Sequence, residues 1–330
     1  MKRAILDAAL DAAGITSYRW RRRSNGLYCF NFHRVGNDDG SAFHPNLYSC
    51  TGSRFAEIVA FLRSNFEMIG IDQVVQLVEA GTVPDRRYGM ISFDDGYVDG
   101  YEVAYEVLRR HGCPAVFFLP TDFIDGREVP WWDRIAWRVA QLGNGTLQVP
   151  GADQRIRITR TDLKGSIRRV LRVVKDSSSV PMLEKVVAIE EQVDCPNIRE
   201  SGSPLFVSWD QVREMRKGGM WFGSHSRSHR ILSHLTEAEQ LAELSESKRI
   251  LEEQISEPVD ALAYPLGGLD TYTAFTKRAA KACGFKIAFN FHGGMNRDPA
   301  AHRYDIQRIT IEGNMDVRAV MRSAAYAVSE

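Results

Sequence analysis

Residues 89–96 read Gly-Met-Ile-Ser-Phe-Asp-Asp-Gly, a short apolar run that ends in two adjacent carboxylates. Such a run is typical of a buried β-strand. Similar runs recur along the chain, at residues 27–35, 115–119, 220–223, 259–264, 286–291 and 306–311. Patterns of helical period lie between them, at residues 54–65, 72–80, 101–111, 209–217, 237–255, 271–283 and 315–327. This alternation predicts an α/β fold with a parallel sheet wrapped by helices, and about seven repeats favour a barrel over an open sheet.

One stretch breaks the alternation. From about residue 125 to 204 the helical patterns are rich in Arg and Lys, and strand candidates are few. We interpret this stretch as a helical insertion or cap on a barrel that spans residues 27–330. Residues 1–26 would precede the barrel as an Ala-rich helix, at about 5–15, and a basic segment with Arg19, Arg21, Arg22 and Arg23.

The composition excludes several classes of protein. The 330 residues carry 42 Lys and Arg against 42 Asp and Glu, and this neutral balance argues against a general nucleic-acid binder. No run approaches the ~20 apolar residues of a membrane-spanning helix. Asp7 and Asp11 interrupt the segment where a signal peptide would be apolar. Five scattered cysteines without a Cys-x-x-Cys pair favour reduced thiols, so we expect a cytoplasmic protein.

Asp94 and Asp95 directly follow the strand at 89–93, and catalytic groups in parallel α/β folds collect where strands end. Two adjacent carboxylates repel each other, so we expect a positive partner, most simply a metal ion. Taken alone, the pair fits a helix N-cap equally well. His225 and His229 shift this balance because they lie four residues apart, directly after another predicted strand.

Two histidines and one carboxylate leave coordination positions open for water and substrate, which is typical of a catalytic metal site. The same ligands fit zinc in a hydrolase and Fe(II) in an oxygenase. If Asp95 is the ligand, Asp94 remains free to act as a base on water. Hydrolysis needs such a base, whereas an oxygenase does not.

Three segments together resemble motifs of the polysaccharide deacetylases, the NodB-homology or carbohydrate esterase family 4 enzymes. They are Ser92-Phe93-Asp94-Asp95-Gly96, His225-Ser226-Arg227-Ser228-His229 and Tyr264-Pro265-Leu266-Gly267. The resemblance implies a distorted (β/α)₇ barrel that removes an acyl group, usually acetyl, from an amino sugar. By position it makes Asp94 the general base and Asp95, His225 and His229 the ligands of Zn²⁺, or of another divalent metal such as Co²⁺ or Ni²⁺. The backbone N–H of Leu266 would then help bind the oxyanion.

The chain departs from the family pattern at two places. Ala263 stands where an Arg usually braces the catalytic Asp, and the usual C-terminal motif with its general-acid His has no clean match. The segment from Phe30 to Val35 is similar to the front strand of a permuted branch, which includes biofilm poly-N-acetylglucosamine deacetylases. In that branch this strand supplies the acid, so His33 is our candidate.

Other residues are candidates for the remaining roles. Arg308 is our candidate to replace the missing Arg beside Asp94, and a surface ion pair is the competing reading. His292 or His302 would be the acid if His33 is a packed strand histidine. Trp131 and Trp132, together with Tyr264 and Pro265, are the candidate substrate-binding residues, because aromatic faces stack on sugar rings. The competing reading is that the two tryptophans anchor the insertion on the barrel, which is the commoner role of Trp.

These observations predict a metal-dependent hydrolase that removes an N-acyl group from an amino sugar in polysaccharide or glycoconjugate biosynthesis. The substrate would be nucleotide-linked, lipid-linked or an oligosaccharide. The alternatives are an N-deformylase of a nucleotide-linked amino sugar, a non-catalytic carbohydrate-binding relative and a non-haem iron oxygenase. For a lipid-linked substrate, the arginines between Arg19 and Arg23 would make a peripheral contact with anionic lipid. A solvated cap before the first strand is the simpler reading of that cluster.

Overall fold

The computed structural model describes residues 10–36, 44–175, 180–198 and 204–329. Its internal contacts divide the chain into two compact units. The larger unit combines the chain up to Asn37 with Ser49–Asp125 and Phe206–Glu330, and the smaller combines Asp38–Tyr48 with Gly126–Leu205. The insertion expected at about 125–204 therefore falls almost wholly within the smaller unit. Its role as a cap stays a prediction.

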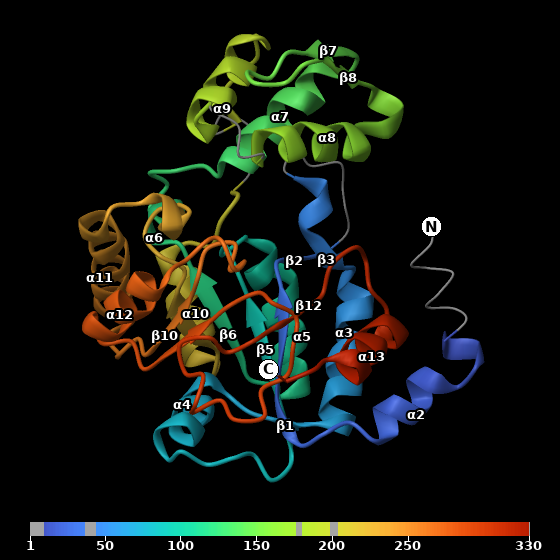
Figure 1. Ribbon diagram of the computed structural model, residues 1–330, viewed down its shortest axis with the longest axis vertical. Coiled ribbons are helices and arrows are strands. Elements are labelled where there is room, and N and C mark those ends of the chain that lie inside the picture. Colours follow the sequence, from blue (N-terminus) through green and yellow to red (C-terminus); the bar gives the residue numbers. More distant parts are fainter. Residues whose placement is uncertain (1–9, 37–43, 176–179, 199–203, 330) are drawn as a thin grey trace. The chain divides into compact units, whose positions relative to one another are not determined.

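The larger unit is built on one parallel sheet with the strand order β11-β10-β9-β6-β5-β1-β12, and β4 also pairs with β5. The strands are β1 (Gly26–Phe32), β4 (Glu67–Met68), β5 (Arg87–Phe93), β6 (Ala115–Leu119), β9 (Trp221–Ser224), β10 (Ala261–Ala263), β11 (Ile287–Phe289) and β12 (Ile309–Thr310). Helices surround this sheet (Figure 1). Every strand predicted from the sequence is present, which confirms the α/β class; β4 was not predicted.

Strand β1 shows why apolar runs form this sheet. All seven of its residues are buried, as expected for a parallel strand that is covered on both faces. Tyr28, Phe30 and Phe32 belong to the larger hydrophobic core. Leu27 and Cys29 alternate with them and belong to a second core on the opposite face. The period-two alternation of the strand thus divides its side chains between two cores.

Helices of the larger unit cover the sheet and close one end of it. They are α2 (Ile15–Arg21), α3 (Gly52–Asn65), α4 (Ile71–Glu79), α5 (Glu106–His111), α6 (Thr121–Ile124), α10 (Trp209–Lys217), α11 (Glu237–Ile255), α12 (Ala274–Ala282) and α13 (Val317–Tyr326). Helix α4 lies near the start of β1 (Figure 1), and its buried Ile71, Val74 and Val78 join the second core. Within the described residues, no helix is both long and apolar enough to cross a membrane.

Side-chain caps define the starts of several helices close to where the sequence pattern predicts them. Ser208, Thr236 and Thr273 each accept a hydrogen bond from the backbone N–H three residues later, at the starts of α10, α11 and α12. One predicted helix, at 101–111, differs from expectation. Its first part, Gly100–Tyr105, is a π-helical turn, and the α-helix begins only at Glu106.

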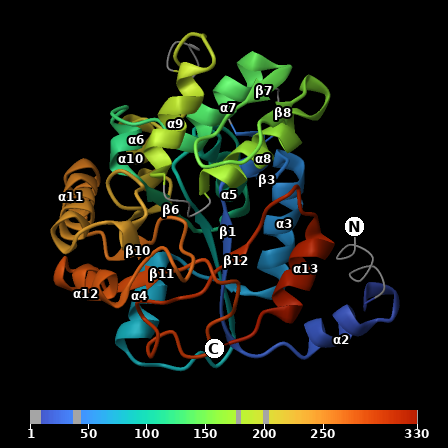
Figure 2. The same cartoon turned by 45° about the horizontal axis from the view of Figure 1, so that its top comes forward.

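The smaller unit contains α7 (Trp131–Leu142), α8 (Leu163–Lys175) and α9 (Met182–Glu191), together with a short hairpin of β7 (Gly145–Leu147) and β8 (Ile156–Ile158). Figure 2 shows the hairpin beside α8. Helix α8 turns its apolar stripe inward, with Ile167, Val170 and Val174 buried. The helical character matches the sequence pattern, but the hairpin was not predicted.

The basic segment near the N-terminus is partly structural. The helix expected at about 5–15 lies largely outside the described residues, and α2 occupies Ile15–Arg21 instead. Arg19 stacks on Tyr326 of α13, and Arg23 stacks on Trp20 with its guanidinium 3.5 Å from the ring centroid. Arg23 also donates to the backbone of Asn65. Two of the four arginines therefore hold this segment against the rest of the unit.

Candidate active site

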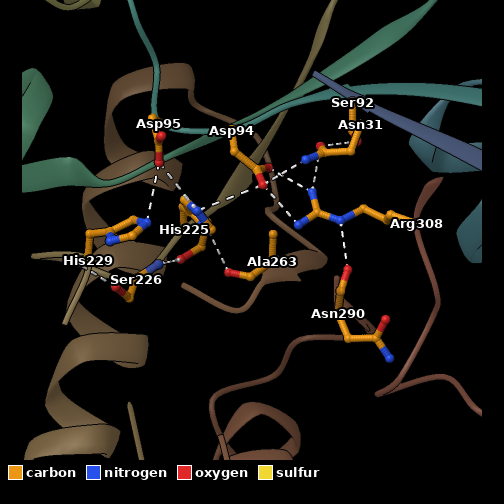
Figure 3. A network of polar contacts seen from close by, with 11 residues as sticks. Asn31, Ser92, Asp94, Asp95, His225, Ser226, His229, Ala263, Asn290 and Arg308 are labelled. Atoms are coloured by element: carbon orange, nitrogen blue, oxygen red, sulfur yellow. Dashed lines mark hydrogen bonds and ion pairs between the residues drawn. The ribbon is translucent and has the colours of Figure 1, made fainter. Parts of the chain in front are cut away.

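The site lies at the edge of the sheet where parallel strands end. Asp94 and Asp95 follow β5, and His225 follows β9. Because the parallel strands of one sheet end at the same edge, and only β6 separates β5 from β9, residues 130 positions apart in the sequence meet there (Figure 3). All three side chains are buried. The structure thus brings the residues of these two motifs together, at the edge of the sheet where the sequence pattern predicted them.

Asp95, His225 and His229 form a compact group of potential metal ligands. One ligand atom from each residue lies within 4.8 Å of the others. The Asp95 Oδ1 atom is 3.3 Å from the His229 Nε2 atom and 3.6 Å from the His225 Nε2 atom. Asp95 and His229 both have left-handed backbone, with φ of 72° and 57°. Such conformations are unfavourable for residues other than glycine and cluster at functional sites.

A divalent cation fits this group. The buried Oδ1 atom of Asp95 meets no well-oriented hydrogen-bond donor among the described residues, and it faces two imidazole nitrogens. A buried carboxylate oxygen without a hydrogen-bond donor destabilises the fold unless a further positive group pairs with it. Two imidazoles and one carboxylate are a donor set that zinc and Fe(II) both accept. The residues present therefore suit a catalytic divalent metal.

The environment of His225 prepares its ring for ligation. Its Nδ1 atom is 2.8 Å from the carbonyl oxygen of Ala263, so Nδ1 carries the proton and Nε2 presents its lone pair to Asp95. Burial lowers the pKa of His225 to about 4, against the opposing effect of Asp94. The imidazole is therefore neutral near pH 7, the form that binds a metal. Ala263, where the family usually has an Arg, takes part through its backbone.

Asp94 lies beside this group and is held by a separate set of contacts. Arg308 Nη1 donates to Asp94 Oδ1 over 2.7 Å, and Arg308 Nη2 donates to Asp94 Oδ2 over 2.9 Å. Asn31 Nδ2 donates to the same Oδ2 over 3.1 Å. Burial by itself would raise the pKa of Asp94, but the charge of Arg308, and then that of His225 when its ring is protonated, lower it below its ordinary value. Asp94 is therefore an oriented, ionised carboxylate.

Arg308 is in turn fixed by polar groups on both sides (Figure 3). Its Nε donates to the carbonyl of Asn290, and its Nη1 also donates to the Oδ1 atom of Asn31. Ser92 Oγ donates to the same Asn31 oxygen over 2.6 Å. Neither Asn31 nor Asn290 was predicted as a site residue from the sequence. The sequence did contain a signal that could have identified them. Each is a polar residue between two phenylalanines within a predicted strand, where a polar side chain needs a specific partner.

The three candidate acids have different surroundings. His33 follows β1, is half-buried, and meets the ring of Phe291 edge-on at 5.8 Å between ring centroids. A protonated His33 would lower the pKa of both Asp94 and Asp95, so it lies within electrostatic reach of the two carboxylates. His292 lies 3.4 Å from the hydroxyl of Tyr272, and His302 is exposed. The structure thus brings His33 near the carboxylates.

The third motif holds a strained backbone. Leu266 has left-handed φ of 61°, and Gly267, with φ of 61°, packs its backbone against Phe291 so closely that a Cβ atom would lie 2.8 Å from that side chain. The N–H of Leu266 donates to no other residue in the described part of the chain. It is therefore available to an external acceptor such as an oxyanion.

The side chains predicted to contact substrate are buried. Tyr264 is fully buried, stacks on Tyr272 at 4.2 Å, and donates from its hydroxyl to the carbonyl of Tyr304. It therefore packs the core instead of facing a ligand, because its polar end is already bonded inside the protein. Pro265 is buried next to it.

Trp131 and Trp132 are also buried, within the smaller unit, and pack edge-on against each other at 5.5 Å. Their indole rings have little exposed surface for stacking on a sugar. This burial favours the anchoring alternative, and a sugar-binding role for these two side chains stays a prediction.

Fold and site together define an α/β barrel protein with a candidate metal site at the carboxyl ends of its strands. Residues 82–288 match the family described as polysaccharide deacetylase. The match covers more than half of the chain, so the protein belongs to the polysaccharide deacetylase family, as its motifs predicted.

A curated relative of low sequence identity carries the name of the same family. YxkH of Bacillus subtilis (strain 168), whose name assigns it to the polysaccharide deacetylases, is 20% identical over 233 residues. The alignment covers 70% of this chain and 54% of YxkH, so the chain spans about half the length of that relative.

Solved structures of low sequence identity share the fold. The deacetylase PplD of Streptococcus pyogenes, solved in complex with acetate, gives a TM-score of 0.60 at 17% identity and covers 91% of this chain and 99% of PplD. IcaB from Ammonifex degensii gives a TM-score of 0.56 at 16% identity and covers 92% and 99%. These matches confirm the predicted distorted (β/α)₇ barrel.

Proposed function

We propose that the protein is a metal-dependent hydrolase that removes an N-acyl group, most simply acetyl, from an amino sugar. The observation that carries this proposal is the ionised, two-pronged Asp94–Arg308 pair lying beside Asp95, His225 and His229. The three metal ligands alone would fit a binding protein or an oxygenase equally well. A second carboxylate, oriented and next to that group, is the part that hydrolysis requires.

Asp95, His225 and His229 would hold the divalent cation, with Zn²⁺, Co²⁺ or Ni²⁺ as candidates. When bound, the cation would supply Lewis acidity that lowers the pKa of water and polarises the substrate carbonyl. The remaining chemistry belongs to the side chains of the chain itself. Arg308 would keep both oxygens of Asp94 in one orientation, so that the carboxylate faces the position of the attacking water.

Hydrolysis of the amide follows from these positions. The oxygen of water bonds to the acyl carbon, and Asp94 accepts one of its protons. The N–H of Leu266 donates to the oxygen that becomes negative in the tetrahedral intermediate. The C–N bond then breaks, and His33 donates a proton to the departing nitrogen. The products are a carboxylic acid and a free amino sugar.

The missing Arg of the third motif does not argue for a non-catalytic protein. Ala263 offers no side-chain contact to Asp94, but Arg308, which directly precedes β12, binds both of its oxygens. The positive partner of Asp94 thus comes from the residue before β12 instead of from the third motif. This arrangement supports the catalytic proposal over the alternative of a carbohydrate-binding relative.

The substrate class is part of the proposal. Family membership supports a carbohydrate amide, and the acetate bound to PplD is the acid that deacetylation releases. Formyl differs from acetyl by one methyl group, so an N-deformylase of a nucleotide-linked sugar is the second candidate. We propose a cytoplasmic setting, in which the sugar would be linked to a nucleotide or a lipid.

One experiment tests this function. Purified protein is analysed for metal content, and release of acetate and formate is measured on N-acyl amino sugars linked to UDP or dTDP and on N-acetylglucosamine oligomers. Metal-dependent release that disappears in Asp94→Asn supports the proposal. Sugar binding without acid release would identify a binding protein, and turnover that needs Fe(II) and O₂ would identify an oxygenase; both would overturn it.

A further inference from the structure

The loop that carries both candidate histidine ligands has an unfavourable backbone. It runs from His225 to His229, and Ser226 and His229 both have left-handed φ, at 61° and 57°. Neither residue is glycine, so these conformations persist only if neighbouring groups hold them. The groups that do so decide where the two imidazole rings point.

Glu243 of helix α11 is one such group, and the proposed reaction gives it no role. Its side chain is buried, with the residue 3% exposed. The Oε2 atom accepts hydrogen bonds from the backbone N–H of Arg227, at 3.0 Å, and of Ser228, at 2.8 Å. The Oε1 atom accepts a bond from the Ser228 hydroxyl at 2.5 Å. One carboxylate thus binds three donors in the middle of the loop.

Ser247, one helical turn further along α11, holds the start of the same loop. Its hydroxyl lies 2.7 Å from that of Ser224, which accepts from the N–H of Ser226. The Ser226 hydroxyl then accepts from the N–H of His229. Because residues four apart share one face of a helix, α11 contacts both the loop and Ser224, the strand residue directly before it.

We propose that Glu243 is the positioning residue for the metal-ligand loop: it fixes the directions of His225 and His229 by binding the backbone between them. The inference rests on the proposed metal-dependent function, and it concerns a residue that touches neither metal nor substrate. When a group that orients the metal ligands without touching the metal is removed, the affinity for the metal falls strongly.

A merely structural role for Glu243 predicts a different result. If the carboxylate only stabilised the packing of α11, its loss would lower the thermal stability of the whole unit. It would leave the metal affinity of the folded protein unchanged. A positioning role predicts a loss of metal affinity and of kcat in protein that remains folded, with a smaller effect on KM.

Three variants separate these roles. Glu243→Met keeps the volume and removes every acceptor, whereas Glu243→Gln keeps one oxygen for the two N–H groups. Ser228→Ala removes the hydroxyl bond alone. Glu253→Gln is the matched control, because Glu253 lies on the same helix, is exposed, and pairs with Arg249. Each variant is compared with wild type for Co²⁺ affinity by calorimetry, for kcat and KM, and for thermal unfolding.

We expect Co²⁺ affinity to fall roughly 10- to 100-fold in Glu243→Met, the range seen when groups behind metal ligands are removed. Glu243→Gln should recover part of that loss, Ser228→Ala should lose least, and Glu253→Gln should match wild type. Equal affinity in Glu243→Met and wild type would overturn the inference. If Glu243→Met does not fold, the Co²⁺ affinities of Glu243→Gln and Ser228→Ala decide. Lower affinity than wild type in these variants supports the inference, and wild-type affinity in both overturns it.

A second readout needs no metal. Hydrogen exchange of the Arg227 and Ser228 amides in metal-free protein should be slow in wild type and much faster in Glu243→Met. Unchanged exchange would overturn the role of Glu243 even if the protein proves inactive. Conversely, a wild type that binds no metal and releases no acid would overturn the proposed function, while the exchange result still reports on the loop.

Discussion

Arg308 and Asp94 form a two-pronged ion pair between side chains that are 1% and 3% exposed. The two residues are 214 positions apart in the sequence, and each nitrogen of the guanidinium fork meets one carboxylate oxygen. A buried pair with this geometry orients the carboxylate and compensates its burial.

Arg308→Met should destabilise the protein by about 3–5 kcal/mol, because it leaves a buried carboxylate without its partner. Turnover should fall as well, since Asp94 loses its orientation. Arg308→Lys should recover part of the stability but little of the activity, because Lys cannot make the two-pronged contact. Urea unfolding and acid-release assays measure the two effects. The control is Arg249→Met, whose exposed pair with Glu253 should be worth under about 1 kcal/mol. A change no larger in Arg308→Met would contradict the role of the pair.

His33→Ala should lower kcat by roughly 10²-fold or more while metal content stays at the wild-type level. The reason is that the departing nitrogen would lose its proton donor, whereas no predicted metal ligand changes. Metal analysis and kcat are measured on the same preparation. Near-normal turnover would contradict the assignment of His33 as the general acid, and His292→Ala would then be the next variant to assay.

Removal of divalent metal with a chelator should abolish turnover and lower the melting temperature, because a ligand that binds only the folded state stabilises it. Adding Zn²⁺ or Co²⁺ back should restore both. Asp95→Asn should remain folded but show no metal-dependent rise in melting temperature. Differential scanning fluorimetry across a metal titration checks this. An equal rise in Asp95→Asn and wild type would show that the metal binds elsewhere.

Trp132→Leu should reduce stability by roughly 1–3 kcal/mol, because it removes part of a buried aromatic side chain from the smaller unit. At a temperature where the variant remains folded, its KM for the sugar substrate should match that of wild type. Chemical unfolding and steady-state kinetics separate the two effects. A rise in KM of tenfold or more with unchanged stability would restore the sugar-stacking role.

Much of the fold could be predicted because local pattern and tertiary environment agree. The runs at 89–93 and 115–119 are apolar throughout, and parallel strands covered on both faces require such runs. The strands β4, β7 and β8 were missed, and β7 and β8 are hard to predict because, unlike the equally short β10 and β11, they do not lie within a longer, mostly apolar run. The helix at 101–111 was predicted, but its π-helical start was not, because that depends on packing.

From the sequence alone we could predict the family, the parallel α/β class and the candidate ligands Asp95, His225 and His229. These depend on short motifs directly after apolar runs, and the motifs are local. Which groups surround them depends on how the chain folds. The fold brings Arg308 to Asp94 in place of the Arg absent at Ala263, and it brings Asn31 into contact with both. It places Glu243 against the backbone of the histidine loop. It also buried Tyr264 and Trp132 in cores. Such pairings join side chains far apart in the chain, and nothing in local sequence specifies the distance between them.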